Sequence, residues 1–139
     1  MKKVLGLLMA SALIMSCSKD DNNNVSKVDM SKLTVGKWYF SGTKTTVAGQ
    51  SVNQPYEHAC TTAKDYEMYG TNGTLTGVEY TSDCNPMTYT DTYTVNGTSI
   101  TSDGSTGTIK ELSSSKLLIE YQETVNGVKF TYEQTYTAN

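Results

Sequence analysis

The stretch KLLIEYQETVNGVKFTYEQTY, residues 116–136, decides the fold class. Its two halves flank Asn126-Gly127, a pair that favours the positive backbone dihedrals of a tight hairpin turn. On both sides of this turn, side chains alternate between apolar and polar, which is typical of an antiparallel sheet with one buried face. The apolar series is Leu117, Ile119, Tyr121, Val128, Phe130, Tyr132 and Tyr136, and the polar series includes Glu120, Gln122, Lys129, Thr131, Glu133 and Thr135.

The same pattern recurs upstream, where Gly and Asn interrupt Thr- and Tyr-rich segments at intervals of about eight to twelve residues. The segments with strand character are 37–46, near 52–60, 66–68, 75–80, 89–95, around 100, and 106–112. We therefore expect an all-β domain over Leu33–Asn139, an antiparallel up-and-down meander of eight or nine strands. Closure into a barrel is favoured because it leaves no exposed edges. A two-sheet β-sandwich is the alternative.

The first 16 residues have the layout of an export signal. Lys2 and Lys3 precede an apolar run, Val4–Met15, and the small residue Ser16 follows it. The run is about 12 residues long, whereas a bilayer-spanning helix needs about 20. A buried core helix is the rival interpretation, but such a helix would be apolar along one stripe and not all round. The pattern predicts a signal peptide over residues 1–16.

Ile14-Met15-Ser16-Cys17 resembles a lipobox, the cleavage site of bacterial lipoproteins. The resemblance implies that Cys17 becomes the first residue and carries a diacylglycerol and an amide-linked acyl chain such as palmitate. Two or more chains are what stable anchoring requires. Residues 17–32 would then form a flexible tether. The rival is ordinary secretion, with Cys17 as a free thiol.

The residues directly after Cys17 bear on location. Cys17-Ser-Lys-Asp-Asp is similar to the acidic signal that sends Bacteroidetes lipoproteins to the outer face of the outer membrane. We therefore expect a lipid-anchored protein of the outer membrane, exposed at the cell surface. The periplasmic face is the alternative.

Charge argues against a nucleic-acid partner. Removal of residues 1–16 leaves nine lysines against fourteen acids, a formal net charge near −5. Nucleic-acid sites need clustered Lys and Arg. The chain also has no arginine, so bidentate recognition of phosphate or carboxylate by a guanidinium group is excluded.

Two cysteines remain once Cys17 is acylated. Cys60 and Cys84 would stand in an exported compartment, where disulfides persist, and we expect them to pair. A metal site that also uses His58 is the rival. Three candidate ligands without a Cys-x-x-Cys pair are a weak metal pattern.

Gly36-Lys37-Trp38, at the start of the first expected strand, is similar to the Gly-x-Trp motif of the lipocalins. The order of lipobox, acidic tether, Gly-Lys-Trp, Cys60 and Cys84 resembles the lipocalin-like lipoproteins of Bacteroidetes, over about residues 33–137. The resemblance implies that Trp38 plugs the closed end of the barrel and that Cys60 and Cys84 staple it.

Catalytic residues do not form a recognisable set. The single histidine, His58, lies two residues before Cys60, and no Gly-x-Ser-x-Gly motif is present. Glu120 and Glu133 could face each other as the acids of a glycosidase do, but both fall on the polar side of their hairpin. We expect a protein that is not an enzyme and that has no cofactor or metal.

Ten tyrosines are more than packing demands in a domain of this size. The inward-facing aromatic residues could fill the barrel or line a ligand pocket. The candidates for lining are Tyr66, Tyr93, Tyr121, Phe130, Tyr132 and Tyr136.

Two functions follow from these two possibilities. The first is a membrane-anchored, non-enzymatic binding module for a small apolar or amphipathic ligand. The second is a surface protein-interaction module, either an accessory subunit or an enzyme inhibitor, with a filled barrel. It would act through loops at 47–54 and 81–88 and an aromatic patch of Tyr56, Tyr69 and Tyr80.

Overall fold

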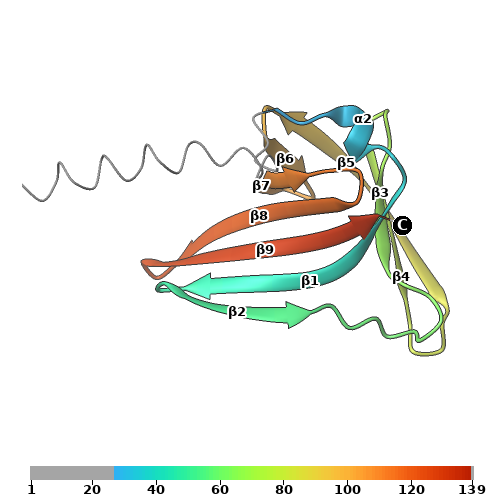
Figure 1. Ribbon diagram of the computed structural model, residues 1–139, viewed down its shortest axis with the longest axis horizontal. Helices are drawn as coiled ribbons and strands as arrows, with labels where there is room; N and C mark the ends of the chain where they lie inside the picture. Colours follow the sequence, from blue (N-terminus) through green and yellow to red (C-terminus); the bar gives the residue numbers. More distant parts are fainter. Residues whose placement is uncertain (1–26, 139) are drawn as a thin grey trace, which may run out of the picture.

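Nine antiparallel strands follow a short helix in the computed structural model, which describes residues 27–138 (Figure 1). The elements are α2 (Met30–Leu33), β1 (Lys37–Val47), β2 (Gln50–Pro55), β3 (Tyr66–Tyr69), β4 (Thr74–Tyr80), β5 (Pro86–Asn96), β6 (Ser99–Ser102), β7 (Ser105–Leu112), β8 (Lys116–Val125) and β9 (Val128–Ala138). From β3 to β9 each strand pairs with the next, so the predicted meander is confirmed.

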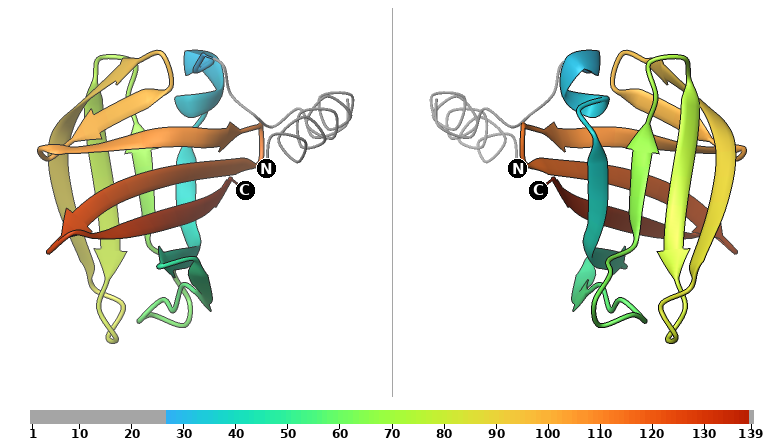
Figure 2. Two further views of the ribbon diagram at one scale, coloured as in Figure 1. Left: turned by 90° about the vertical axis from the view of Figure 1, so that its left-hand side faces the viewer. Right: turned by 90° about the vertical axis from the view of Figure 1, so that its right-hand side faces the viewer.

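Pairing of β1 with both β3 and β9 closes the sheet. Trp38 of β1 lies opposite Glu67 of β3 on one side and opposite Ala138 of β9 on the other. Eight strands therefore form a closed barrel, and β2 is a ninth strand that pairs with the far half of β1. Figure 2 shows β8 and β9 crossing β3, β4 and β5 at a steep angle, as the strand tilt of a small barrel requires. The predicted barrel is confirmed, and the alternative two-sheet β-sandwich is wrong.

Successive turns alternate between the two ends of the barrel because the strands are antiparallel. One end carries the turns β1–β2, β4–β5, β6–β7 and β8–β9. Three of these are two-residue turns with positive φ at both positions, Ala48-Gly49, Asp103-Gly104 and Asn126-Gly127, which matches the right-handed twist of the paired strands. The Asn126-Gly127 turn and its hairpin are as predicted.

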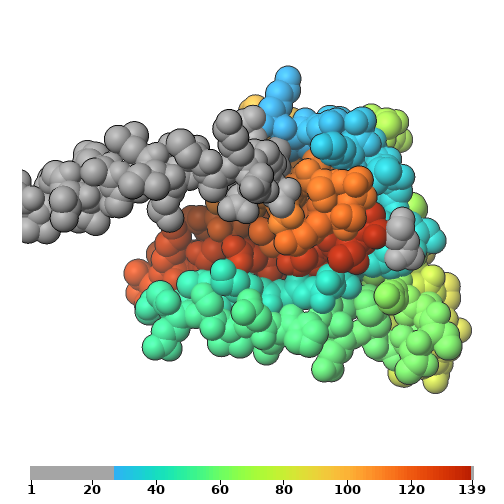
Figure 3. Space-filling model, in the orientation of Figure 1, coloured from blue at the N-terminus to red at the C-terminus, as the bar shows by residue number. Residues whose placement is uncertain are grey.

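The other end is sealed by the N-terminal segment. Leu33 and Trp38 are fully buried, and the Trp38 indole N–H donates to the Leu33 carbonyl oxygen at 2.8 Å. Figure 3 shows the helix segment packed directly on the residues of β7 and β8, and Leu112 and Leu117 share its apolar cluster. Trp38 thus lies where the resemblance implied a plug. We call this end the closed end and the opposite one the open end.

Packing begins before the boundary expected at Leu33. Val28 is buried, and its N–H donates to the carbonyl oxygen of Gly97. Asp29 then caps α2 by accepting from the N–H of Ser31 at 3.0 Å. The last residues assigned to the flexible tether are therefore part of the folded domain.

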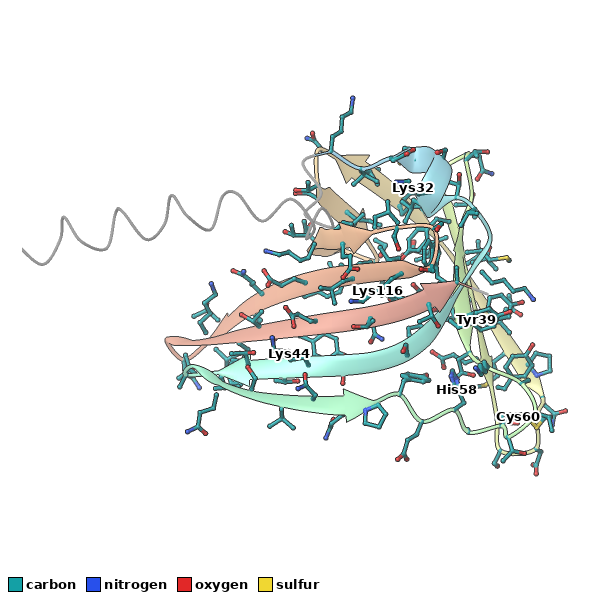
Figure 4. All side chains as sticks on the ribbon, in the orientation of Figure 1. Lys32, Tyr39, Lys44, His58, Cys60 and Lys116 are labelled. Atoms are coloured by element: carbon teal, nitrogen blue, oxygen red, sulfur yellow. A yellow bond between two sulfur atoms is a disulfide. The ribbon has the colours of Figure 1, made fainter. Side chains whose placement is uncertain are left out.

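One expected strand is shorter than predicted, and the segment that follows it is held by a disulfide. The strand placed near 52–60 ends at Pro55 as β2, and residues 56–65 form an irregular segment. Cys60 in this segment is bonded to Cys84 in the β4–β5 turn, so the predicted pairing is confirmed. Figure 4 shows His58 and Cys60 close together beside the lower ends of β3 and β4.

The predictions for the N-terminus fall outside the described residues. These are the signal peptide at 1–16, the acylated Cys17 and the tether up to residue 26. Within residues 27–138, no helix is long and apolar enough to cross a membrane.

Candidate ligand-binding site

The pairing register determines which side chains point into the barrel. Glu67 lies opposite the buried Trp38, and Tyr69 is itself buried, so these two residues of β3 face inward. Tyr66 therefore points outward. It packs against Tyr39. The ammonium nitrogen of Lys37 lies over the Tyr66 ring, 4.2 Å from the ring centroid. The prediction that Tyr66 lines a pocket is wrong, because β3 is shifted by one residue relative to the expected alternation, which exchanges the two faces.

Tyr93 and Tyr136, also expected at the pocket, are buried among core residues. Tyr93 packs edge-on against Tyr69 and donates to the Gly70 carbonyl oxygen at 2.8 Å. Tyr136 packs against Phe40. Both fill the barrel interior and do not line its open end.

The other three expected residues, Tyr121, Phe130 and Tyr132, line a cavity of about 650 Å³ at the open end. Tyr121 and Tyr132 are opposite each other on β8 and β9. The β6–β7 turn and the outer end of β8 complete the walls with Ser102, Asp103, Ser105, Thr106, Gln122 and Glu123.

A second cavity, of about 570 Å³, lies on the other side of the β6–β7 turn. It shares Ser102 and Asp103 with the first cavity. Its remaining lining residues are Glu67, Leu75, Tyr89, Thr90 and Asp91. The open end thus combines aromatic rings, hydroxyl groups and carboxylates.

Glu67 is the polar centre of the interior. Each of its carboxylate oxygens accepts one tyrosine hydroxyl, Tyr69 at 3.0 Å and Tyr89 at 2.9 Å. Tyr89 reaches Glu67 because its ring crosses β4 at Gly77, where a Cβ atom would collide with the ring. The absence of a side chain at Gly77 therefore positions Tyr89.

The tyrosines around Glu67 stay protonated well above neutral pH. Burial raises the pKa of Tyr69 and Tyr136 well above the usual value, and the negative charge of Glu67 adds to the effect. Burial, together with Glu67 and Tyr132, raises the pKa of Tyr121 to about 12. Burial and Glu67 also raise the pKa of Tyr89. Two of these hydroxyls, those of Tyr69 and Tyr89, donate hydrogen bonds to Glu67.

Asp91 is the second carboxylate of the inner wall. Its Oδ1 accepts from the N–H of Thr92 at 2.7 Å. Its Oδ2 is buried and has no hydrogen-bond partner among the described residues. A buried polar atom without a partner is rare and destabilising, so a donor that reached this oxygen would stabilise the site.

Other candidate residues lie away from the cavities. Glu120 and Glu133 lie opposite each other in the register of β8 and β9, on the outer face. Glu133 forms an ion pair with Lys44. His58 accepts from the N–H of Asp65 at 3.0 Å and packs against Tyr56. Within the described part of the chain, no three His, Cys, Asp or Glu residues are grouped so as to hold a metal ion.

The aromatic surface patch expected for a protein-interaction module is not present as such. Tyr69 is buried, and Tyr56 stacks on Phe40 and donates to Asp65 at 2.9 Å. Two of the three residues proposed for that patch are therefore committed to interior packing. The interior is also not completely filled, since the two cavities open at its end.

Comparison with solved structures finds the same architecture in a lipocalin-like protein from Bacteroides uniformis. The two chains are 19% identical, with a TM-score of 0.50, over 73% of this chain and 96% of the other. At this identity the likeness concerns the fold, which is that of a lipocalin-like β-barrel. No protein-family model matches the chain, and no curated protein has a significantly similar sequence.

The polar residues at the centre of the site, Glu67, Tyr69, Tyr89 and Asp91, were not among the predicted lining residues. A signal for two of them exists, because Tyr89 and Asp91 alternate with threonines in phase with Tyr93. An acidic residue on the inward face of a strand is a departure from the apolar pattern and marks a site. Glu67 had no such signal, because tyrosines and a methionine surround it on both faces of β3.

Proposed function

We propose that this protein is a lipid-anchored, lipocalin-like lipoprotein that binds a small amphipathic ligand at the open end of its barrel and does not catalyse a reaction. The observation that carries the proposal is the cavity of about 650 Å³ at the end opposite the sealed one. Small-molecule sites commonly have volumes of about 300–1,000 Å³ and combine apolar walls with a few polar groups. Tyr121, Phe130 and Tyr132 supply rings here, and Ser102 and Ser105 supply hydroxyls.

The anchoring part of the proposal is supported by the sequence. Residues 1–17 carry the export signal and the lipobox-like segment that ends at Cys17. A lipid there would hold the barrel at the outer membrane, and the acidic residues after Cys17 favour the cell surface. Incorporation of labelled palmitate by the full chain, and its loss in Cys17→Ser, tests this part.

Native mass spectrometry tests ligand binding. The protein for this measurement spans residues 18–139, which contain all the described elements. It is purified from an oxidising compartment. We expect an added mass that disappears on denaturation. Ser105→Trp should remove that mass, because Ser105 lines the cavity and a large ring would fill it.

The matched control is Thr124→Trp. Thr124 is exposed on β8 and does not line either cavity, so this variant should keep the added mass. A bare native mass for the parent protein, or an added mass that Ser105→Trp retains, contradicts the proposal.

A further inference from the structure

The walls of the two cavities carry four carboxylates and no basic side chain. Glu67 and Asp91 are half-buried on the inner wall, and Asp103 and Glu123 are exposed at the rim. The chain has no arginine, and none of the lysines within residues 27–138 lines either cavity. The negative charge at the open end is therefore uncompensated by the cavity walls.

The lysines that form ion pairs are engaged elsewhere. Among the described residues, the pairs are Lys44 with Glu133 and Lys116 with Glu111. Figure 4 shows Lys44 and Lys116 beside the barrel strands β1 and β8. None of the four cavity carboxylates takes part in such a pair.

The inner carboxylates still have free acceptor capacity. Each oxygen of Glu67 accepts one tyrosine hydroxyl, although a carboxylate oxygen can accept two hydrogen bonds. Oδ2 of Asp91 is buried and without a partner among the described residues. A ligand group that offers several N–H donors and a positive charge would satisfy both residues.

Aromatic rings lie next to these carboxylates. Tyr89 and Tyr132 remain about two-fifths exposed, at 39% and 40%, although they belong to inward-facing positions. Tyr89 lines the cavity that holds Glu67 and Asp91, and Tyr121 and Tyr132 line the neighbouring cavity. The faces of such rings attract organic cations and also pack against an apolar chain.

We propose that the open end of the barrel selects ligands with a positively charged amine on an apolar body. The ammonium group would lie between Glu67 and Asp91, and the apolar part would lie against Tyr89 and extend past the shared residues Ser102 and Asp103 towards Tyr121 and Tyr132 of the first cavity. An organic cation is favoured over a metal ion, because no metal-holding group of side chains exists within residues 27–138. This inference rests on the proposed function and specifies its ligand class.

Calorimetric titration with octylamine, 1-octanol and octanoate separates charge from apolar contact, because the three probes are unbranched molecules with the same number of carbon atoms. We expect octylamine to bind at least about tenfold more tightly than octanol, which corresponds to one charge-assisted contact. Octanoate should bind more weakly than octanol. Glu67→Gln and Asp91→Asn should each reduce the affinity for octylamine and leave that for octanol unchanged.

Glu120→Gln is the matched control, since Glu120 lies on the outer face of β8, and it should change none of the three affinities. If Glu67→Gln does not fold, as judged by circular dichroism, Asp91→Asn carries the test alone. Equal binding of octylamine and octanol overturns the amine inference but leaves the ligand-binding function intact. Absence of binding by octylamine overturns the inference, and native mass spectrometry then decides separately whether any ligand is bound.

Discussion

Gly77 controls the position of Tyr89 at the centre of the candidate site. The ring of Tyr89 occupies the space that a Cβ atom of residue 77 would need. From this position its hydroxyl donates to Glu67 at 2.9 Å. The absence of a side chain at Gly77 thus allows the hydrogen bond between Tyr89 and Glu67.

We predict that Gly77→Ala lowers the free energy of unfolding by about 1–3 kcal/mol, because the new methyl group displaces the ring. In a Tyr89→Ala background the same substitution should cost almost nothing, since the obstacle is gone. Urea denaturation of the four proteins of this double-mutant cycle measures the coupling. Additive effects of the two substitutions would show that Gly77 and Tyr89 do not interact as described.

Ionisation of the interior tyrosines should limit stability at high pH. The pKa of Tyr121 is raised to about 12, and burial raises the pKa of Tyr69 and Tyr136 well above the usual value. In the unfolded chain tyrosine titrates near about 10. Since the folded pKa is the higher one, the stabilisation is complete below pH 10 and is lost as the pH rises towards 12 and beyond.

Phenolate absorbance and circular dichroism, recorded together during an alkaline titration, check this expectation. The buried tyrosines should ionise only in the same step in which β-structure is lost, while exposed ones titrate earlier. Ionisation of all ten tyrosines near pH 10 in a protein that keeps its β-structure would be the opposite result.

Some site residues could be predicted from the sequence because they lie in long alternating strands. Tyr121, Phe130 and Tyr132 follow the regular pattern of the last hairpin and do line the cavity. Tyr66 and Glu67 could not be assigned in this way, because β3 has only four residues and both of its faces carry aromatic side chains. Their orientation is determined by pairing with Trp38, a contact distant in sequence.

The disulfide fixes the segment between β2 and β3. This irregular segment contains Tyr56, which stacks on Phe40, and Asp65, which accepts from the N–H of Tyr80 at 2.8 Å. Cys60 and Cys84 are 24 residues apart. The bond therefore holds this irregular segment to the β4–β5 turn.

We predict that Cys60→Ser lowers the free energy of unfolding by about 3 kcal/mol, from the loss of loop closure. For a domain of this size the melting temperature should fall by roughly 10 °C. Cys84→Ser and the double variant should melt at the same temperature as Cys60→Ser, because all three lack the same bond. A parent-like melting temperature under oxidising conditions would refute a stabilising role.

At the scale of elements, strands with Asn-Gly or Asp-Gly turns were the most predictable. β8 and β9 begin and end as the alternation indicates, because a two-residue turn fixes their register. The strand expected near 52–60 was less predictable. The residues from Tyr56 onward are held by a disulfide and side-chain contacts, which leave no periodic pattern in the sequence.

The whole molecule has two chemically different ends. The N-terminal segment, Leu33 and Trp38 seal one end with apolar contacts, and the described chain enters the barrel there through Val28. The other end carries the cavities, the four carboxylates and the partly exposed tyrosines.

Mapping of the binding site by nuclear magnetic resonance tests this division most directly. The chain has a single tryptophan, whose indole N–H reports on the closed end. On titration with octylamine, we expect amide signals of Glu67, Tyr89 and Asp91 to shift while the Trp38 indole signal stays in place. Shifts centred on the Trp38 indole, or on Tyr39 and Tyr66 of the outer face, would contradict a ligand site at the open end.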